Sequence, residues 1–213
     1  MTELEFVLPA DIERRSFEII ESELGEMKIP EKNKPIVMRC IHTTADFDYA
    51  KNLCFSENAV DHALKLLRGG CVIVTDTNMA LAGINKTALK KLGCEAICFM
   101  AEPETAKLAE NRGITRAAAS VELAAKIKKP IIYVVGNAPT ALVALYDHMK
   151  NGSFMPDFIV GMPVGFVNVV QSKELIMNSN AHYIVAKGRK GGSNVAAAVC
   201  NGLMYMLTRY RDK

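Results

Sequence analysis

Short apolar runs alternate along this chain with longer segments in which apolar residues recur at helical spacing. The clearest run is Pro-Ile-Ile-Tyr-Val-Val at 130–135, which leads into a glycine-containing turn at 136–140. Continuous apolar runs of this length are typical of strands that are buried on both faces. The alternation of such strands with helices predicts an α/β fold of the three-layer, Rossmann-like kind, in which helices cover both faces of a mainly parallel sheet.

The boundaries of the predicted elements come from capping residues, prolines and glycines. Strands are predicted from an apolar run that begins at Ile36, and at 71–75, 94–99, 130–135, 158–160 and 182–186. Helices are predicted at 12–24, 56–68, 85–92, 103–113, 116–127, from the 136–140 turn to 150, at 167–177 and at 194–210. No linker, low-complexity segment or repeat interrupts this order, so we expect a single domain spanning residues 1–213.

The segment 36–47 begins as an apolar run after Pro35 and then becomes polar. We expect the strand to end there, and ligands of open α/β sheets bind beyond the carboxyl ends of strands. His42 could transfer protons near neutral pH, and Arg39 could bind a carboxylate through two hydrogen bonds. The alternative is that His42 only caps the strand and bonds to the backbone.

Polar or glycine-rich turns follow four of the predicted strands, at 42–46, 76–79, 136–140 and 187–193. Because the carboxyl ends of parallel strands lie at one edge of the sheet, these turns could line one pocket. Two of them lead directly into helices, whose first backbone N–H groups attract anions.

The turn at 187–193 is the strongest candidate for an anion site, because it carries Lys187, Arg189 and Lys190. Its adjacent glycines, Gly191 and Gly192, would let the backbone approach a bulky ligand closely. The alternative is a solvated, flexible basic loop.

The composition excludes several classes of protein. Half of the 213 residues are apolar, and the net charge of +3 gives no basis for binding nucleic acid. No apolar run reaches the roughly 20 residues of a membrane span, and residues 1–8 lack the pattern of a signal peptide. We expect the six cysteines to be free thiols in a reducing cytoplasm, without a disulfide or a structural metal, because none has Cys-x-x-Cys spacing. The glycine fingerprints of dinucleotide-binding and phosphate-loop proteins are absent, which argues against an unrelated nucleotide-binding protein.

Seven separated motifs resemble those of the precorrin-8X methylmutase family, also called precorrin isomerases, whose cobalt-pathway form is cobalt-precorrin-8 methylmutase. They occur in the family's order and span nearly the whole chain, at 39–47, 76–79 with 83–84, 113–116, 136–142, 161–167, 172–173 and 188–193. Two small departures, Gln171 in place of an acid and Gly202 in place of an alanine, lie outside the His42 motif.

The resemblance implies an isomerase of cobalamin biosynthesis that moves a methyl group from C11 to C12 of a tetrapyrrole with many carboxylates. The product would be hydrogenobyrinate or, where cobalt is already part of the substrate, cobyrinate. By the same resemblance His42 is the proton-transferring residue, and Ser16 and Arg39 contact the substrate. We expect the remaining substrate contacts to come from the polar turns and helix starts, at Thr43, Arg116, Asn137, Arg189, Gly191, Gly192 and Ser193. The shift needs no cofactor, since protonation of the conjugated ring by a histidine would make the receiving carbon electron-poor.

Two further expectations remain open at the level of sequence. A carrier that binds the tetrapyrrole without chemistry would share the same anion-binding turns, and only His42 argues against it. The family is expected to work as a homodimer, and the last predicted helix, which is apolar around more than one face, is compatible with a subunit contact.

Overall fold

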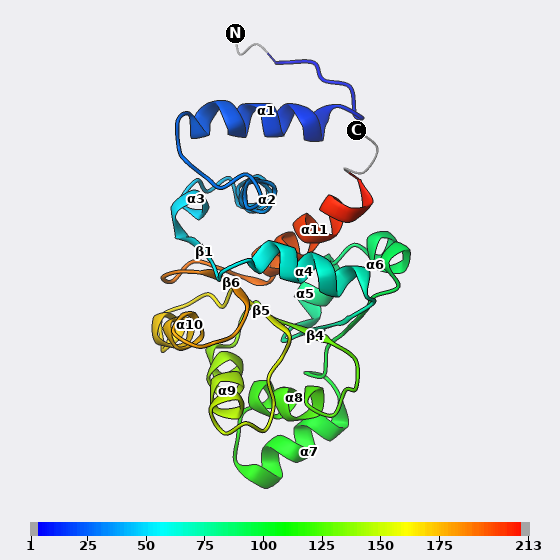
Figure 1. The fold of residues 1–213 in the computed structure, drawn as a ribbon, viewed down its shortest axis with the longest axis vertical. Coiled ribbons are helices and arrows are strands. Elements are labelled where there is room, and N and C mark those ends of the chain that lie inside the picture. Colours follow the sequence, from blue (N-terminus) through cyan, green and yellow to red (C-terminus); the bar gives the residue numbers. More distant parts are fainter. Residues whose placement is uncertain (1–3, 210–213) are drawn as a thin grey trace.

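A six-stranded sheet lies at the centre of the computed structural model, which describes residues 4–209 (Figure 1). The strand order is β1-β6-β5-β4-β2-β3. Every neighbouring pair is parallel except β1 and β6, so β1 forms an antiparallel edge. The strands are β1 (Leu53–Phe55), β2 (Val72–Thr75), β3 (Glu95–Ile97), β4 (Ile131–Val135), β5 (Phe158–Gly161) and β6 (Tyr183–Ala186). The predicted mainly parallel sheet is confirmed.

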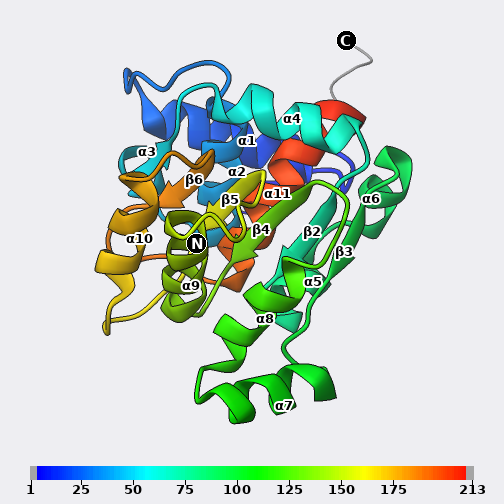
Figure 2. The same cartoon turned by 60° about the horizontal axis from the view of Figure 1, so that its bottom comes forward.

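Helices cover both faces of this sheet (Figures 1 and 2). One face carries α4 (Ala59–Arg68), α5 (Asn78–Gly83), α6 (Lys86–Leu92) and α11 (Ser193–Thr208). The other carries α7 (Pro103–Arg112), α8 (Arg116–Ala124), α9 (Pro139–Lys150) and α10 (Val169–Met177). Beyond α11 lies an additional layer of α1 (Ile12–Leu24), α2 (Lys34–Thr44) and α3 (Tyr49–Asn52) (Figure 1).

The side chains of the central strands alternate between two cores, as the period of a strand requires. On β4, Ile132 and Val134 belong to the core beneath α11, whereas Tyr133 and Val135 belong to the core beneath α8, α9 and α10. All four side chains are buried, which explains why the sequence shows a continuous apolar run instead of an alternating one.

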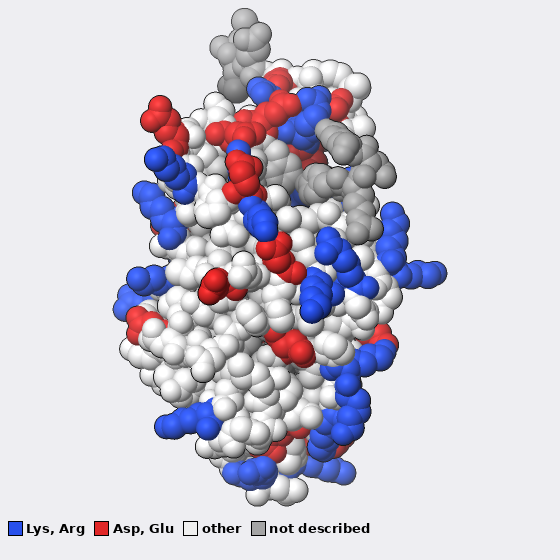
Figure 3. All heavy atoms as spheres, in the orientation of Figure 1, with Lys and Arg blue, Asp and Glu red and all other residues white. Residues whose placement is uncertain are grey.

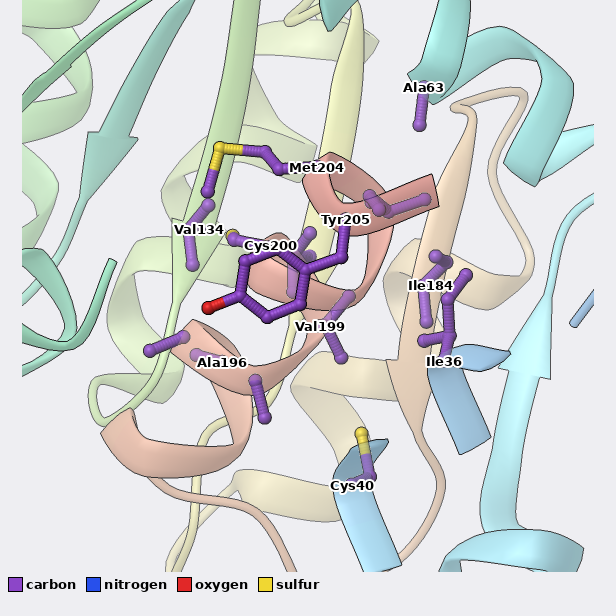
Figure 4. Packing of buried hydrophobic residues seen from close by; sticks show 14 of the residues in the cluster. Ile36, Cys40, Ala63, Val134, Ile184, Ala196, Val199, Cys200, Met204 and Tyr205 are labelled. Carbon is purple, nitrogen blue, oxygen red and sulfur yellow. The ribbon is translucent and has the colours of Figure 1, made fainter. Parts of the chain in front are cut away.

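Helix α11 is buried within the chain. It packs against α2, α4, α5 and α6, and Figure 4 shows Val199 and Met204 between α2 and the sheet. The apolar faces that suggested a subunit contact are therefore covered by the chain's own helices, and α11 gives no support to the expected dimer. The predicted end of this helix at residue 210 lies outside the described residues.

The prediction of a strand beginning at Ile36 is wrong, because this segment forms helix α2. Pro35 lies in its first turn, where proline is favoured and its missing N–H group costs nothing. The run from Ile36 to Ile41 is buried on all sides because α2 lies between α1 and α11. A short apolar run cannot by itself distinguish a buried helix from a buried strand.

Other differences are local. Strand β1 and helix α5 were not predicted, and Ser56 does not cap α4, because its hydroxyl accepts a hydrogen bond from the Tyr183 N–H group instead. The six cysteines are free thiols. Among residues 4–209, no helix has the length and apolar character needed to cross a membrane.

Candidate functional site

Asp76, at the carboxyl end of β2, is bound by the turn that follows β4. Its Oδ1 accepts a hydrogen bond from Gly136 N at 2.7 Å, and its Oδ2 accepts bonds from Asn137 N and Ala138 N at 2.9 and 2.7 Å. Burial raises the pKa of this carboxyl group, and the three N–H donors oppose the shift. The backbone N–H groups that were expected to bind an anion before α9 are thus occupied by the chain's own carboxylate.

The turn at 76–79, which contains Asp76, is also joined to the start of α11. The hydroxyl groups of Thr77 and Ser193 are 2.8 Å apart and share a hydrogen bond. The turn at 136–140 meets the start of α11 as well, since a Cβ added at Gly136 would lie 2.7 Å from the Ser193 Cα. Only glycine permits this approach between the end of β4 and the first residue of α11.

The turn after α2 is joined to the same region by Lys190. Its ammonium group lies 2.6 Å from a carboxylate oxygen of Asp46 and 2.6 Å from one of Asp48. The contact with Lys190 lowers the pKa of Asp46. The four polar turns therefore form one connected region at the carboxyl edge of the sheet, although the first of them follows a helix.

His42 lies in the last turn of α2 and is exposed. Its imidazole ring stacks on the Phe17 ring of α1, with ring centroids 5.3 Å apart and an interplanar angle of 27°. The neighbouring Thr43 is also exposed, and its hydroxyl donates to the Arg39 carbonyl oxygen within the helix. His42 is therefore a solvent-accessible imidazole whose orientation depends on a second helix, and it does not cap a strand.

Arg39 is buried beside this stack. Its guanidinium group lies over the rings of Phe17 and Tyr205, at 4.7 and 5.0 Å from their centroids, and donates a hydrogen bond to Glu13. Glu13 also accepts a bond from Arg209. Burial tends to raise the pKa of Glu13, but the hydrogen bond and charge of Arg39 outweigh it, and the pKa is lowered. In this structure the predicted carboxylate-binding group of Arg39 is occupied by an internal carboxylate.

Ser16 lies next to Phe17 on α1, and its hydroxyl donates to the Ile12 carbonyl oxygen at 2.8 Å. This is the common back-bonded state of a helical serine. Ser16 and Arg39 are thus brought to the same region as His42 by Phe17, but the polar groups of both have partners within the chain.

We call residues 187–192 the basic loop. Arg189 is exposed, and its guanidinium carbon lies 5.5 Å from the centroid of the Phe166 ring. The loop is held against the turn after β5, since Gly192 N donates to Met162 O at 2.7 Å. A Cβ at Gly191 would lie 2.3 Å from the same carbonyl oxygen, so this glycine permits contact between two backbone segments.

Two predicted residues lie at the starts of neighbouring helices. Arg116 is the first residue of α8, Asn137 precedes α9, and both side chains are exposed. The hydroxyl group of Thr115 donates to that of Thr140 at 3.1 Å, which places Arg116 beside the turn that carries Asn137. Both can face a ligand above the carboxyl edge of the sheet.

Several residues of this region were missed by sequence reasoning. Glu13 lies three residues before Ser16 and four residues before Phe17, so helical spacing makes it a neighbour of both side chains on α1. The contact between α1 and α2 does not follow from the sequence when the apolar run from Ile36 is interpreted as a strand. Lys173 and Phe166 lie in motifs that carry the family resemblance, but the residues alone gave them no role.

A groove of about 520 Å³ runs between α1 and α2. Phe17 and Met38 contribute apolar surface to it. Its charged lining consists of two cations, Arg14 and Lys34, and of four carboxylates, which outnumber them: Glu13, Glu18, Glu21 and Glu31. Acidic and basic side chains are mixed over this end of the molecule (Figure 3). A ligand with many carboxylates fits the basic loop better than this groove. Within residues 4–209, no three His, Cys, Asp or Glu side chains gather in a way that could hold a metal ion.

Comparison with known proteins gives a consistent result. The family model described as precorrin-8X methylmutase matches residues 11–206. The chain is 43% identical over 205 residues to the cobalt-precorrin-8 methylmutase of Salmonella typhimurium, covering 93% of this chain and 96% of the relative. It is 33% identical over 194 residues to a precorrin-8X methylmutase from a Sinorhizobium species, covering 90% and 92%. The crystal structure of precorrin-8x methyl mutase from Thermus thermophilus superposes with a TM-score of 0.86 at 36% identity, covering 93% of this chain and 98% of that one.

Proposed function

This chain belongs to the precorrin-8X methylmutase family, and we propose that it moves one methyl group from C11 to C12 of precorrin-8X or cobalt-precorrin-8. The product would be hydrogenobyrinate or cobyrinate. The family's members are named as methylmutases, so the chain is an isomerase of cobalamin biosynthesis and an enzyme. Membership of the family argues against the alternative of a non-catalytic tetrapyrrole carrier.

The observation that carries the proposal is the exposed imidazole of His42, stacked on Phe17 and joined through the turn after α2 to the basic loop. We propose that His42 donates a proton to the conjugated ring system as the methyl group moves. The protonated ring makes the receiving carbon more electron-poor, and His42 takes the proton back when the shift is complete. No atom is gained or lost, because the methyl group stays within the molecule.

The exposed cation of Arg189 is the main carboxylate-binding group in this proposal, with Arg116 and Asn137 at the neighbouring helix starts. Holding several carboxylates at once fixes the ring in one orientation over His42. Thr43 lies beside His42, and Gly191, Gly192 and Ser193 shape the backbone where the basic loop enters α11. Ser16 and Arg39 would reach the substrate if one of its carboxylates replaced Glu13 beside the Arg39 guanidinium group.

We further propose that the reaction requires no cofactor: an isomerisation has no net transfer of electrons to or from the substrate and so consumes no oxidant or reductant, and protonation by His42 supplies the activation. Any cobalt would enter as part of the substrate. Chelator-treated enzyme should therefore keep full turnover on the cobalt-free ring. The free state of the six cysteines supports a location in the reducing cytoplasm.

A homodimer remains part of the proposal, with support from a different region than the sequence suggested. Apolar side chains of the N-terminal segment and α1 are highly exposed: Leu4 by 87%, Phe6 by 88%, Leu8 by 58% and Ile12 by 53%. Several large apolar side chains exposed within one short segment suit a subunit contact, where they would be covered. Light scattering at micromolar concentration should give twice the mass of one chain, and a stable monomer would refute the dimer.

The test of function is incubation with precorrin-8X and cobalt-precorrin-8 in parallel, followed by absorbance and mass. An isomerase changes the spectrum catalytically and leaves the mass unchanged, whereas a carrier changes the spectrum once, in proportion to the protein added. His42→Asn should lower turnover by about 10²–10⁴-fold with little change in substrate affinity.

The matched control is His148→Asn, which removes a histidine near the end of α9, where its ring bonds to Ser153. This variant should keep wild-type turnover. Turnover of His42→Asn within a few fold of the wild type would show that His42 is not the acid, even if the methyl shift itself is observed.

A further inference from the structure

Lys173 of α10 has no exposed surface. Its ammonium nitrogen donates hydrogen bonds to two backbone carbonyl oxygens, those of Gly188 and Lys190, each at 2.8 Å. Within residues 4–209 its ammonium group forms no ion pair with a carboxylate. This buried charge plays no part in the mechanism proposed above.

A buried charge that lacks a carboxylate partner destabilises a fold unless its hydrogen bonds compensate. Burial lowers the pKa of Lys173 to about 8, so the ammonium form still predominates at pH 7. An apolar side chain of similar length would fill the same space without this cost. The role of the ammonium group must therefore lie in the two carbonyl groups that it holds.

These two carbonyl groups lie immediately before and after Arg189. The Arg189 carbonyl oxygen accepts a third bond, from Gly165 N at 3.2 Å, and its guanidinium group lies over the Phe166 ring. Lys173 thus binds the backbone on both sides of Arg189, and the turn after β5 binds the backbone of Arg189 itself. A flexible basic loop would have none of these contacts.

We propose that Lys173 is a positioning residue, which fixes the backbone on both sides of Arg189 and thereby presents the guanidinium group to a carboxylate of the substrate. The inference rests on the proposed function for the identity of that substrate. It extends toward His42 as well, because one of the two held residues is Lys190, whose side chain binds Asp46 and Asp48 in the turn after α2. Lys173 therefore helps to fix the basic loop relative to the helix that carries His42.

The decisive experiment is a double-mutant cycle on substrate affinity, measured by absorbance titration with precorrin-8X in the His42→Asn background, where slow turnover lets binding be measured. Lys173→Met keeps the length of the side chain and removes the donors, and Arg189→Ala removes the presented cation. We expect each variant to raise the Kd by about ten- to a hundredfold, the effect of losing one charge-assisted bond. Because Lys173 acts through Arg189, the double variant should bind no more weakly than Arg189→Ala alone.

The control variant is Ile176→Ala, which lies on the same helix and is fully buried. It loosens the packing of α10 and leaves the ammonium contacts in place, so it should lower stability and keep the wild-type Kd. A purely structural role of Lys173 would give the opposite pattern, in which both variants weaken binding in proportion to their loss of stability.

A second readout needs no substrate. Amide hydrogen exchange at 188–190 should be faster in Lys173→Met than in the wild type, and unchanged in Ile176→Ala. If Lys173→Met does not fold, Lys173→Gln, whose amide can still donate to the carbonyl groups, takes its place and should show a smaller effect in both measurements.

An additive cycle, an unchanged Kd in Lys173→Met or unchanged exchange at 188–190 would each overturn the inference. These results differ from failure of the proposed function, which would appear as a wild-type protein that neither binds nor converts the tetrapyrrole. In that case faster exchange in Lys173→Met would still show that Lys173 holds the loop, but the assignment of Arg189 to a substrate carboxylate would be lost.

Discussion

Replacing Asp76 by asparagine tests how the carboxyl edge of the sheet is held together. The substitution keeps the size of the side chain and removes its charge, at the point where β2, β4 and the start of α9 meet. The carboxylate accepts bonds from three backbone N–H groups, those of residues 136, 137 and 138. The asparagine oxygen can accept at most two of them, so its NH₂ group is forced against the third donor.

The expected loss of stability follows from two opposing effects. The substitution removes one of three hydrogen bonds to a charged acceptor, each of which contributes about 1.5–3 kcal/mol, and weakens the other two because the acceptor becomes neutral. Burial of the carboxylate, which raises the pKa of Asp76, costs several kcal/mol that the neutral amide does not incur. With one N–H group left without an acceptor at about 1–3 kcal/mol, we expect Asp76→Asn to lower the free energy of unfolding by about 2–4 kcal/mol.

The measurement is urea unfolding followed by circular dichroism, with Asp157→Asn as the control. Asp157 is exposed and accepts one bond, from Ile131 N at 2.8 Å, at the opposite end of β4. The asparagine oxygen can keep this single bond, so the control should change stability by less than about 0.5 kcal/mol. Equal effects of the two substitutions would refute the reasoning from three donors.

Four further predictions concern single residues. The hydroxyl group of Tyr133 is buried and, among the described residues, has no hydrogen-bond partner, so Tyr133→Phe should raise the free energy of unfolding by about 1 kcal/mol. Tyr183→Phe, whose hydroxyl donates to a backbone carbonyl at 3.2 Å, should lower it by about the same amount, and the two variants are compared by thermal unfolding. Gly191→Ala should reduce both stability and substrate affinity, because the added Cβ would lie 2.3 Å from the Met162 carbonyl oxygen. Urea unfolding and absorbance titration measure the two effects. Wild-type affinity would argue against a role of this turn in binding. Burial and the nearby His182 lower the pKa of His62, so the unfolded chain binds a proton more readily, and stability should fall as the pH drops below about 6.5. Urea unfolding between pH 7.5 and 5 should show this loss, and His62→Gln should reduce it.

The sheet was predictable because its strands carry an unambiguous signal. The run at 130–135 is apolar on both faces and is bounded by a proline and a glycine, which fixes its type and its limits. Helices with a capping side chain were also predicted well. Thr115 accepts a bond from the backbone three residues later, as its position before α8 suggested. The helix predicted from residue 85 begins at Lys86, with Asn85 as its capping side chain.

The N-terminal quarter of the chain was predicted less well, because tertiary contacts decide its structure. The middle of α2 is buried on all sides, since it lies between α1 and α11, and so its run from Ile36 to Ile41 lacks the periodicity of a surface helix. The antiparallel edge strand β1 has three residues and depends on pairing with β6, more than 120 residues later. Neither context is contained in the local sequence.

The candidate site was predicted only in part, because some of its connections also depend on tertiary contacts. The rule that ligands bind at the carboxyl edge of a parallel sheet correctly grouped the turns after β2, β4 and β6. The same rule placed His42 at this edge only because the run from Ile36 was predicted to be a strand. In the structure, the turn that follows His42 is joined to the edge by the contacts of Lys190 with Asp46 and Asp48. Contacts between side chains so far apart in sequence follow from the fold and could not be inferred before it.

The seven motifs that carry the family resemblance are hydrogen-bonded to one another. Asp46 contacts Lys190, Asp76 contacts Gly136, and Thr77 contacts Ser193. Further bonds join the remaining motifs through Thr115 to Thr140, Met162 to Gly192, and Lys173 to Gly188. Much of each motif therefore builds the framework of the site, and the identity of a motif residue does not by itself assign it to the substrate.

The exposed motif residues that remain are the stronger candidates for direct contact with a ligand. His42, Arg116, Asn137 and Arg189 are exposed, and within residues 4–209 their side chains form no hydrogen bond to the rest of the chain. Their replacement should leave the free energy of unfolding within about 0.5 kcal/mol of the wild type, as for other surface positions. Any effect on affinity or turnover must then arise from the substrate itself, which separates these four residues from framework residues such as Asp76, whose replacement alters stability and function together.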